Sequence, residues 1–276
     1  MRKYGRWAIG PVNVATAFLF IASPLAAGMP SISEKPDSYD YDDTMGADWI
    51  RPADVMYIGD SESLGYFGDN IYRAVSTEHD PRTGKLLTVW TYWTCGSDVT
   101  TWLHGAVSHC GVRACNGSGR CARDHAPLDK PGNIPYGPVT RYLKGVRPRI
   151  TLVSLGTNIL TKRHFRKREF YNTYLAAVGQ LADEIVQSGS RCIWIGPPQP
   201  ALDTQPAEEY EAFMSDLGHV AQSHGCGYIN SDTLSDRSLL LQRDPEGTHY
   251  RGAGEIAWAA KVWEKLEPML KAALAG

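Results

Sequence analysis

Short apolar runs alternate along this chain with longer amphipathic segments, and this alternation constrains the fold more than any other feature. The apolar runs cover residues 54–58, 85–94, 150–155, 192–196 and 226–230. The amphipathic segments cover residues 63–75, 170–187, 206–223 and 252–274, with Pro268 expected to kink the last of them or end it early. Strands that alternate with helices form parallel sheets whose faces are covered by the helices. We therefore expect an α/β fold with a mostly parallel, five-stranded sheet.

The N-terminus has the pattern of a secretory signal peptide. Arg2, Lys3 and Arg6 precede a short apolar core at 14–22, and small residues follow up to position 28. This core is shorter than the roughly 20 apolar residues that a membrane-spanning helix needs, and an uncleaved anchor is the alternative. We expect a signal peptide at 1–28, a lead-in with little regular structure at 29–50, and a folded domain at 51–276. The protein would then be periplasmic or secreted, without stable membrane insertion once the signal is cleaved.

Charge and composition exclude several classes of partner. The 276 residues carry a formal net charge of -2, with 43% hydrophobic and 21% charged residues. A protein that binds the phosphate backbone of nucleic acids needs a basic surface, which this balance does not provide. We expect no nucleic-acid partner, and the sequence does not determine the oligomeric state.

The six cysteines predict disulfides if the chain is exported. Four of them lie close together, at Cys95, Cys110, Cys115 and Cys121. Their spacing lacks the paired C-x-x-C elements of a zinc ribbon, so two disulfides are favoured over a zinc site, in a pairing that the sequence leaves open. Cys192 and Cys226 begin consecutive strands of the parallel sheet. These two would lie side by side, and we predict a Cys192–Cys226 disulfide.

Residues 97–149 differ in character from the rest of the chain. Gly, Pro, Cys and His are frequent there and no long period is visible, which indicates an insertion held by disulfides. Trp102 follows Gly96 closely, so its ring is expected either to stack on a substrate or to pack beneath the insertion. His104, His109 and His125 lack a paired carboxylate pattern, so we expect no metal and no cofactor. On the first helix, Asp69 and Asn70 are expected at the surface.

Four positions at the ends of predicted elements carry chemistry together. Ser61, Gly96 and Asn158 follow the first three runs, and His249 precedes the last helix. The carboxyl ends of parallel strands meet at one edge of a sheet, which is where ligands bind. A histidine beside a serine hydroxyl accepts its proton, and amide groups at Ser61, Gly96 and Asn158 could stabilise an oxyanion. This edge is therefore a candidate site of nucleophilic catalysis, in which Asp60 is expected to hold the turn.

Four short blocks at these positions resemble the SGNH hydrolases, the GDSL-type esterases. The blocks are Gly59-Asp60-Ser61, Gly96, Gly156-Thr157-Asn158 and Glu246-Gly247-Thr248-His249. The resemblance implies a flavodoxin-like three-layer α/β/α sandwich and acyl transfer from an ester, usually to water. It also implies that Ser61 is the nucleophile, that Gly96 and Asn158 belong to the oxyanion hole and that His249 is the base.

The acid that supports His249 departs from the family pattern. The family usually has aspartate three residues before the histidine, where this chain has Glu246. We favour Glu246, since Ser-His-Glu triads occur in other hydrolases. Asp244, or a Ser-His dyad held by a backbone carbonyl, is the alternative.

An exported esterase meets the cell envelope and external polymers. Family members with such a location often remove acetyl groups from glycans, including peptidoglycan. We expect an O-acetylesterase that acts on an acylated glycan or a small ester. The alternatives are an O-acyltransferase, a lipase, lysophospholipase or thioesterase with the same triad, and a non-catalytic glycan-binding protein.

Overall fold

A computed structural model describes residues 49–119, 121–124, 134–160, 168–200, 207–234 and 248–276. The expected signal peptide, nearly all of the lead-in, and both candidate acids, Glu246 and Asp244, lie outside these ranges. In the part that is described, no helix is both long enough and apolar enough to span a bilayer.

The centre of the molecule is a seven-stranded sheet in the order β5-β4-β2-β1-β7-β8-β9. Five of these strands are parallel, which confirms the expected parallel sheet: β1 (Val55–Gly59), β2 (Val89–Thr94), β7 (Ile150–Ser154), β8 (Arg191–Ile195) and β9 (Gly227–Ile229). The expected count of five is too low, because β4 (Val112–Asn116) and β5 (Cys121–Asp124) extend the sheet beyond β2 as antiparallel strands.

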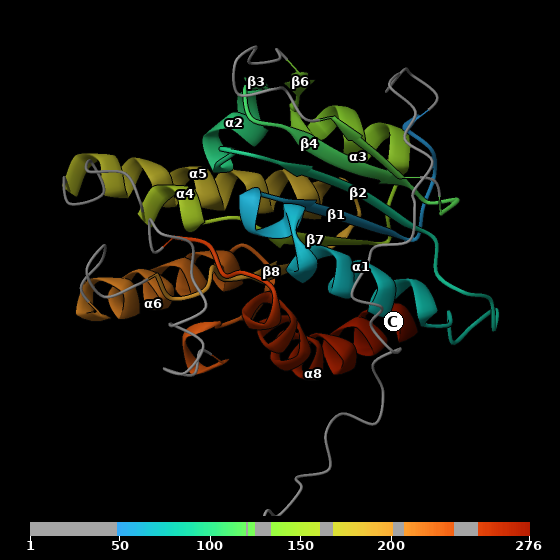
Figure 1. Cartoon of the computed structure of the whole chain (residues 1–276). Helices are drawn as coiled ribbons and strands as arrows, with labels where there is room; N and C mark the ends of the chain where they lie inside the picture. Colours follow the sequence, from blue (N-terminus) through green and yellow to red (C-terminus); the bar gives the residue numbers. More distant parts are fainter. Residues whose placement is uncertain (1–48, 120, 125–133, 161–167, 201–206, 235–247) are drawn as a thin grey trace, which may run out of the picture.

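Helices cover both faces of the sheet, so the predicted three-layer sandwich is confirmed (Figure 1). One face packs against α2 (Val99–His104), α3 (Val139–Val146), α5 (Arg168–Gln187) and α6 (Ala207–Ser223). The other face packs against α1 (Tyr66–Thr77) and α8 (Ala253–Ala275). Two short elements lie at the carboxyl edge, the 3₁₀ turn η2 (Ser61–Leu64) and α4 (Thr157–Leu160), and a second 3₁₀ turn, η4 (Asp232–Leu234), follows β9.

Alternate residues of each strand enter the two cores. Met56 and Ile58 of β1 face one core, whereas Val55 and Tyr57 face the other. This period of two, with apolar residues on both faces, is why the strands are nearly continuous apolar runs in the sequence.

The segment at 97–149 is more regular than the sequence indicated. It contains α2, α3, a small antiparallel sheet of β3 (Ala106–Ser108) and β6 (Ile134–Tyr136), and the β4–β5 hairpin that lies between these two strands in the chain. Helix α3 belongs to the sandwich, because it packs on the same core as α5 before the chain enters β7. These elements are too short to leave a clear period, which explains why the sequence favoured an irregular insertion.

The structure forms three disulfides. The predicted Cys192–Cys226 bond joins the starts of β8 and β9, with a Cα–Cα distance of 4.4 Å. The other two are Cys95–Cys110 and Cys115–Cys121, and the second links directly paired residues of β4 and β5. All six cysteines are therefore paired.

The first and last helices differ from their expected bounds. The first begins at Tyr66 rather than at residue 63, because η2 occupies the turn after β1. The last continues through Pro268 to Ala275, where Leu266, Leu270 and Leu274 remain buried in the core on both sides of the proline.

Candidate active site

The turn after β1 is held by Asp60, as expected. One carboxylate oxygen of Asp60 accepts the N–H of Glu62 at 3.1 Å, and the other accepts the N–H of Thr157 at 3.2 Å. The backbone N–H of Asp60 donates to the Ser154 carbonyl at 3.1 Å. Asp60 thereby fixes Ser61 at the start of η2 and joins the carboxyl ends of β1 and β7. Burial raises the pKa of Asp60 to about 6.

Ser61 and His249 are in direct contact. The Ser61 hydroxyl lies 2.7 Å from Nε2 of His249, and both side chains are partly exposed. His249 lies in the short described segment, 248–252, that precedes α8. A separation of this size allows the imidazole to accept the hydroxyl proton.

The ends of β1, β2 and β7 are tied together by Ser97. Its carbonyl accepts Nδ2 of Asn158 at 2.9 Å, and its hydroxyl lies 2.9 Å from the Thr94 carbonyl and 3.3 Å from the Gly59 carbonyl. Gly96, directly before Ser97, is exposed and has φ of +75°, a conformation that favours glycine. The structure thus brings the segments of Gly96 and Asn158 to the edge where Ser61 lies.

Glu255 links the two helices that follow the serine and the histidine. Its carboxylate accepts the N–H of Gly252 at 3.1 Å and also backbone N–H groups of Tyr66 and Phe67. Gly65 leaves room for it, because a Cβ at that position would collide with the carboxylate. Burial raises the pKa of Glu255 to about 7. The starts of α1 and α8 therefore share one buried carboxylate, a link that no local motif signals.

Asp69 and Asn70 are buried, so the expectation that they lie at the surface is wrong. Asp69 forms an ion pair with Arg113 of β4, and both side chains are largely shielded from solvent. The Asn70 amide donates to the Tyr66 carbonyl at 2.6 Å. The sequence could not show this, because the partner of Asp69 belongs to β4, a strand that was not predicted.

Trp102 has no exposed surface, so of the two roles weighed from the sequence its burial contradicts stacking on a substrate. Its ring centroid lies 5.5 Å from that of Tyr136, 5.8 Å from that of Tyr142 and 6.0 Å from that of Tyr92. The alternative weighed from the sequence, packing beneath the segment at 97–149, describes its position.

No group of His, Cys, Asp and Glu among the described residues could hold a metal ion. Glu246 and Asp244 lie outside those residues, so the identity of the acid behind His249 stays a prediction.

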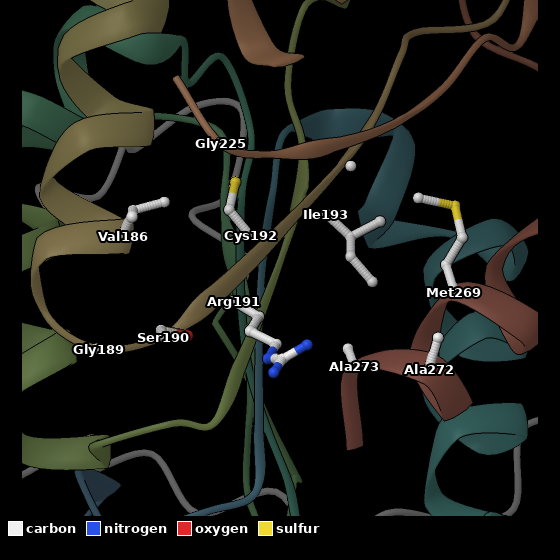
Figure 2. A pocket seen from close by; sticks show the side chains of 11 residues that line it. Val186, Gly189, Ser190, Arg191, Cys192, Ile193, Gly225, Met269, Ala272 and Ala273 are labelled. Atoms are coloured by element: carbon white, nitrogen blue, oxygen red, sulfur yellow. The ribbon is translucent and has the colours of Figure 1, made fainter. Parts of the chain in front are cut away.

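A cavity of about 570 Å³ lies at the opposite edge of the sheet. It is lined by the starts of β8 and β9 and by the ends of α5 and α8, and Figure 2 shows Arg191, Cys192 and Met269 among its lining residues. Strand β8 begins at this cavity and runs away from it toward the edge that carries Ser61. We therefore do not assign the cavity to the chemistry of Ser61.

Comparison with known proteins agrees with this architecture. No protein-family model and no curated protein matches the sequence. The fold is similar to the crystal structure of TesA, with a TM-score of 0.50 and 15% identity over 78% of this chain and 98% of that one. A GDSL-like lipase from Bacteroides thetaiotaomicron has a TM-score of 0.48 and 13% identity, over 80% of this chain and 90% of its own. A family 3 carbohydrate esterase from Clostridium thermocellum has a TM-score of 0.49 and 13% identity, over 82% of this chain and 100% of its own.

At such low identities the likeness concerns the fold. The strand order, the helix layers and the placement of Ser61, Gly96, Asn158 and His249 are consistent with one fold. The chain has the fold of the SGNH hydrolases.

Proposed function

We propose that this protein is an exported serine esterase that removes O-acetyl or other short acyl groups from a glycan of the cell envelope or the exterior, such as peptidoglycan. The observation that carries the esterase proposal is the 2.7 Å contact between the Ser61 hydroxyl and Nε2 of His249 at the carboxyl edge of the sheet. A serine hydroxyl is a weak nucleophile, and a base in contact with it is the arrangement that activates it.

The mechanism follows from this geometry. His249 accepts the hydroxyl proton while Ser61 Oγ attacks the ester carbonyl carbon, which gives a tetrahedral intermediate. Its oxyanion would be stabilised by the N–H groups of Ser61 and Gly96 and by the Asn158 amide. His249 then returns the proton to the leaving alcohol. Water, activated by the same imidazole, releases the acyl group from Ser61.

A carboxylate would hold the His249 ring in the productive orientation. Glu246 is the residue that we assign to this role, with Asp244 as the rival. The imidazolium that forms during attack is stabilised by such a neighbour.

The glycan substrate is inferred from the location of the protein. The N-terminal 28 residues have the pattern of a signal peptide, and three disulfides are typical of proteins in an oxidising compartment. Acylated polymers of the envelope are the esters that an exported enzyme encounters there.

The first experiment compares the wild type with Ser61→Ala on p-nitrophenyl acetate. Turnover by the wild type that is lost in the variant supports the esterase, whereas equal rates would leave a glycan-binding protein as the better description. A series of longer acyl chains then separates an acetylesterase, whose rate falls with chain length, from a lipase or thioesterase.

The second experiment measures acetate release from isolated cell wall and from acetylated xylan. Release from either polymer supports the glycan substrate. Transfer of the acetyl group to an added sugar in preference to water would identify an O-acyltransferase instead. Activity on small esters without release from either polymer would contradict the glycan assignment.

A further inference from the structure

The Cys95–Cys110 disulfide lies directly beside the glycine assigned to the oxyanion hole. Cys95 precedes Gly96 in the chain, and a Cβ placed on Gly96 would lie 3.9 Å from Sγ of Cys110. We propose that this disulfide positions the Gly96 amide for catalysis, and that a dithiol which reduces it lowers the esterase activity. The proposal rests on the esterase function described above.

Hydrogen bonds join the same two chain segments that the disulfide links. We call Cys95 and residues 108–111 together the clamp, because they hold the backbone on the exposed side of Gly96. The Cys95 N–H donates to the Gly111 carbonyl at 3.0 Å. The Ser108 hydroxyl lies 3.2 Å from the Cys95 carbonyl and 2.9 Å from the Gly111 carbonyl, and it accepts the Gly111 N–H at 3.2 Å. Residues 108–111 therefore hold the backbone immediately before Gly96 through hydrogen bonds and through the disulfide.

Ser97 anchors the inner side of the same turn. It is completely buried, and its hydroxyl reaches the carbonyls of Thr94 and Gly59. The Ser97 carbonyl accepts a hydrogen bond from Nδ2 of Asn158, the side-chain amide assigned to the oxyanion hole. A shift of the turn after β2 would consequently affect two of the three expected donors. The Gly96 amide lies between a buried anchor and an exposed covalent clamp.

Exposure distinguishes this disulfide from the other two. Cys110 is exposed and Cys95 is partly exposed. By contrast, Cys115, Cys121, Cys192 and Cys226 have exposed fractions of 0, 3, 3 and 5%. Thiol–disulfide exchange requires access of the attacking thiolate to a sulfur atom. A small dithiol should therefore reduce Cys95–Cys110 before the other two.

The dithiol supplies the electrons and protons that reduce the Cys95–Cys110 bond. Its thiolate attacks Sγ of Cys110, the Cys110–Cys95 bond breaks, and Cys95 leaves as a thiolate that takes up a proton. The second thiol of the reagent then attacks the mixed disulfide and releases the Cys110 thiol. The protein gains two electrons and two protons, and the reagent becomes a cyclic disulfide.

Reduction of the disulfide is expected to destabilise the transition state more than the bound substrate. An oxyanion-hole donor interacts with charge that develops only as the tetrahedral intermediate forms, so its loss lowers kcat more than it changes KM. Complete loss of one donor typically costs about 100- to 1000-fold in kcat. Because the hydrogen bonds of Ser108 and Gly111 remain after reduction, we expect a smaller decrease, of about 10- to 100-fold.

The test compares two double variants of the intact protein. Cys95→Ser/Cys110→Ser removes the proposed clamp, and Cys115→Ser/Cys121→Ser removes the disulfide between β4 and β5 as a matched control. Each is assayed for kcat and KM on p-nitrophenyl acetate, and for the inhibition constant of a trifluoromethyl ketone, whose adduct with Ser61 carries an oxyanion. We expect the first variant to lose kcat/KM and inhibitor affinity by the same factor, whereas the control keeps both within about 3-fold of the wild type, because it leaves the residues around Gly96 in place.

Wild-type kcat and inhibitor affinity retained by Cys95→Ser/Cys110→Ser would overturn the proposal. Equal losses in both double variants would also overturn it, since they would indicate general destabilisation. If the first variant does not fold, the wild type is treated with dithiothreitol and the free thiols are located by mass spectrometry. Activity that falls as Cys95 and Cys110 become free, and returns on reoxidation, supports the proposal, whereas unchanged activity refutes it.

The assays distinguish a wrong esterase assignment from a wrong role for the disulfide. If the wild type and Ser61→Ala are equally inactive on every ester, the proposed function itself is wrong. If the wild type is active and Cys95→Ser/Cys110→Ser is as active as the wild type, the esterase function stands and the proposed role of the disulfide is wrong.

Discussion

The Ser61 hydroxyl and Nε2 of His249 lie 2.7 Å apart although 188 positions separate the two residues in the chain. The parallel sheet makes this possible, because Ser61 follows one strand and the segment before α8 crosses the same edge. If this pair is the catalytic couple, then replacing either residue by alanine should lower kcat by at least about 1000-fold. Steady-state kinetics on p-nitrophenyl acetate measures this, with Ser63→Ala, a buried serine of the same turn that bonds the Tyr57 hydroxyl, as the control for damage to the turn. Activity in Ser61→Ala equal to that of the wild type would contradict the assignment.

Glu246→Ala should lower kcat by about 100- to 10,000-fold, because a carboxylate orients His249 and stabilises its protonated form. Asp244→Ala is the matched control, two residues away on the same segment, and should keep most of the activity. The reverse result would identify Asp244 as the acid. Full activity in both variants would indicate a Ser-His dyad.

Asn158→Ala should lower kcat by about 100- to 1000-fold with little change in KM, since its amide would donate to the oxyanion only in the transition state. Asn158→Asp, of nearly equal size, should be at least as harmful, because its carboxylate replaces a donor by a negative charge. An increase in KM at constant kcat in both variants would instead place Asn158 in ground-state binding.

Glu255 should make stability depend on pH. Burial raises its pKa from 4.5 to about 7, so the folded state binds this proton more tightly than the unfolded state does. The associated stability is fully present below pH 4.5 and is lost as the pH rises through 7, on the order of 3 kcal/mol if the whole shift is realised.

Asp60, with a pKa of about 6, acts in the same direction. The melting temperature should therefore fall between pH 5 and pH 8 more steeply in the wild type than in Glu255→Gln. Parallel curves for the two proteins would contradict this assignment.

The buried ion pair of Asp69 and Arg113 should be costly to break. Asp69→Ala leaves the Arg113 guanidinium buried without its carboxylate, for which we expect a loss of about 3 to 5 kcal/mol in the free energy of unfolding. Lys271→Ala, which removes the pairs of an exposed lysine with Glu267 and Glu78, is the control and should cost less than about 1 kcal/mol. Urea denaturation of the two variants makes the comparison, and equal losses would show that the buried pair adds no particular stability.

The sequence predicted those parts of the molecule that have a local signal. The strand at 150–155 is apolar on both faces because the sheet is covered on both sides, and Gly59-Asp60-Ser61 marks the turn that follows the first strand. The two additional strands of the main sheet escaped prediction because they lie among the frequent glycines and cysteines of residues 97–149, and because one of them carries a buried arginine.

Features that depend on distant pairing left no such signal. Asp69 has the sequence context of a surface helix residue, and only the presence of Arg113 on β4 explains its burial. Likewise, nothing near Trp102 shows that Tyr92, Tyr136 and Tyr142 enclose its ring.

The clamp at Cys95 and Cys110 has a consequence for when the protein becomes active. If the protein is exported as proposed, a newly made chain in the reducing cytosol holds two thiols where the oxidised protein holds a bond. The same enzyme would then hydrolyse acyl esters about 10- to 100-fold more slowly inside the producing cell than after oxidation outside the cytosol.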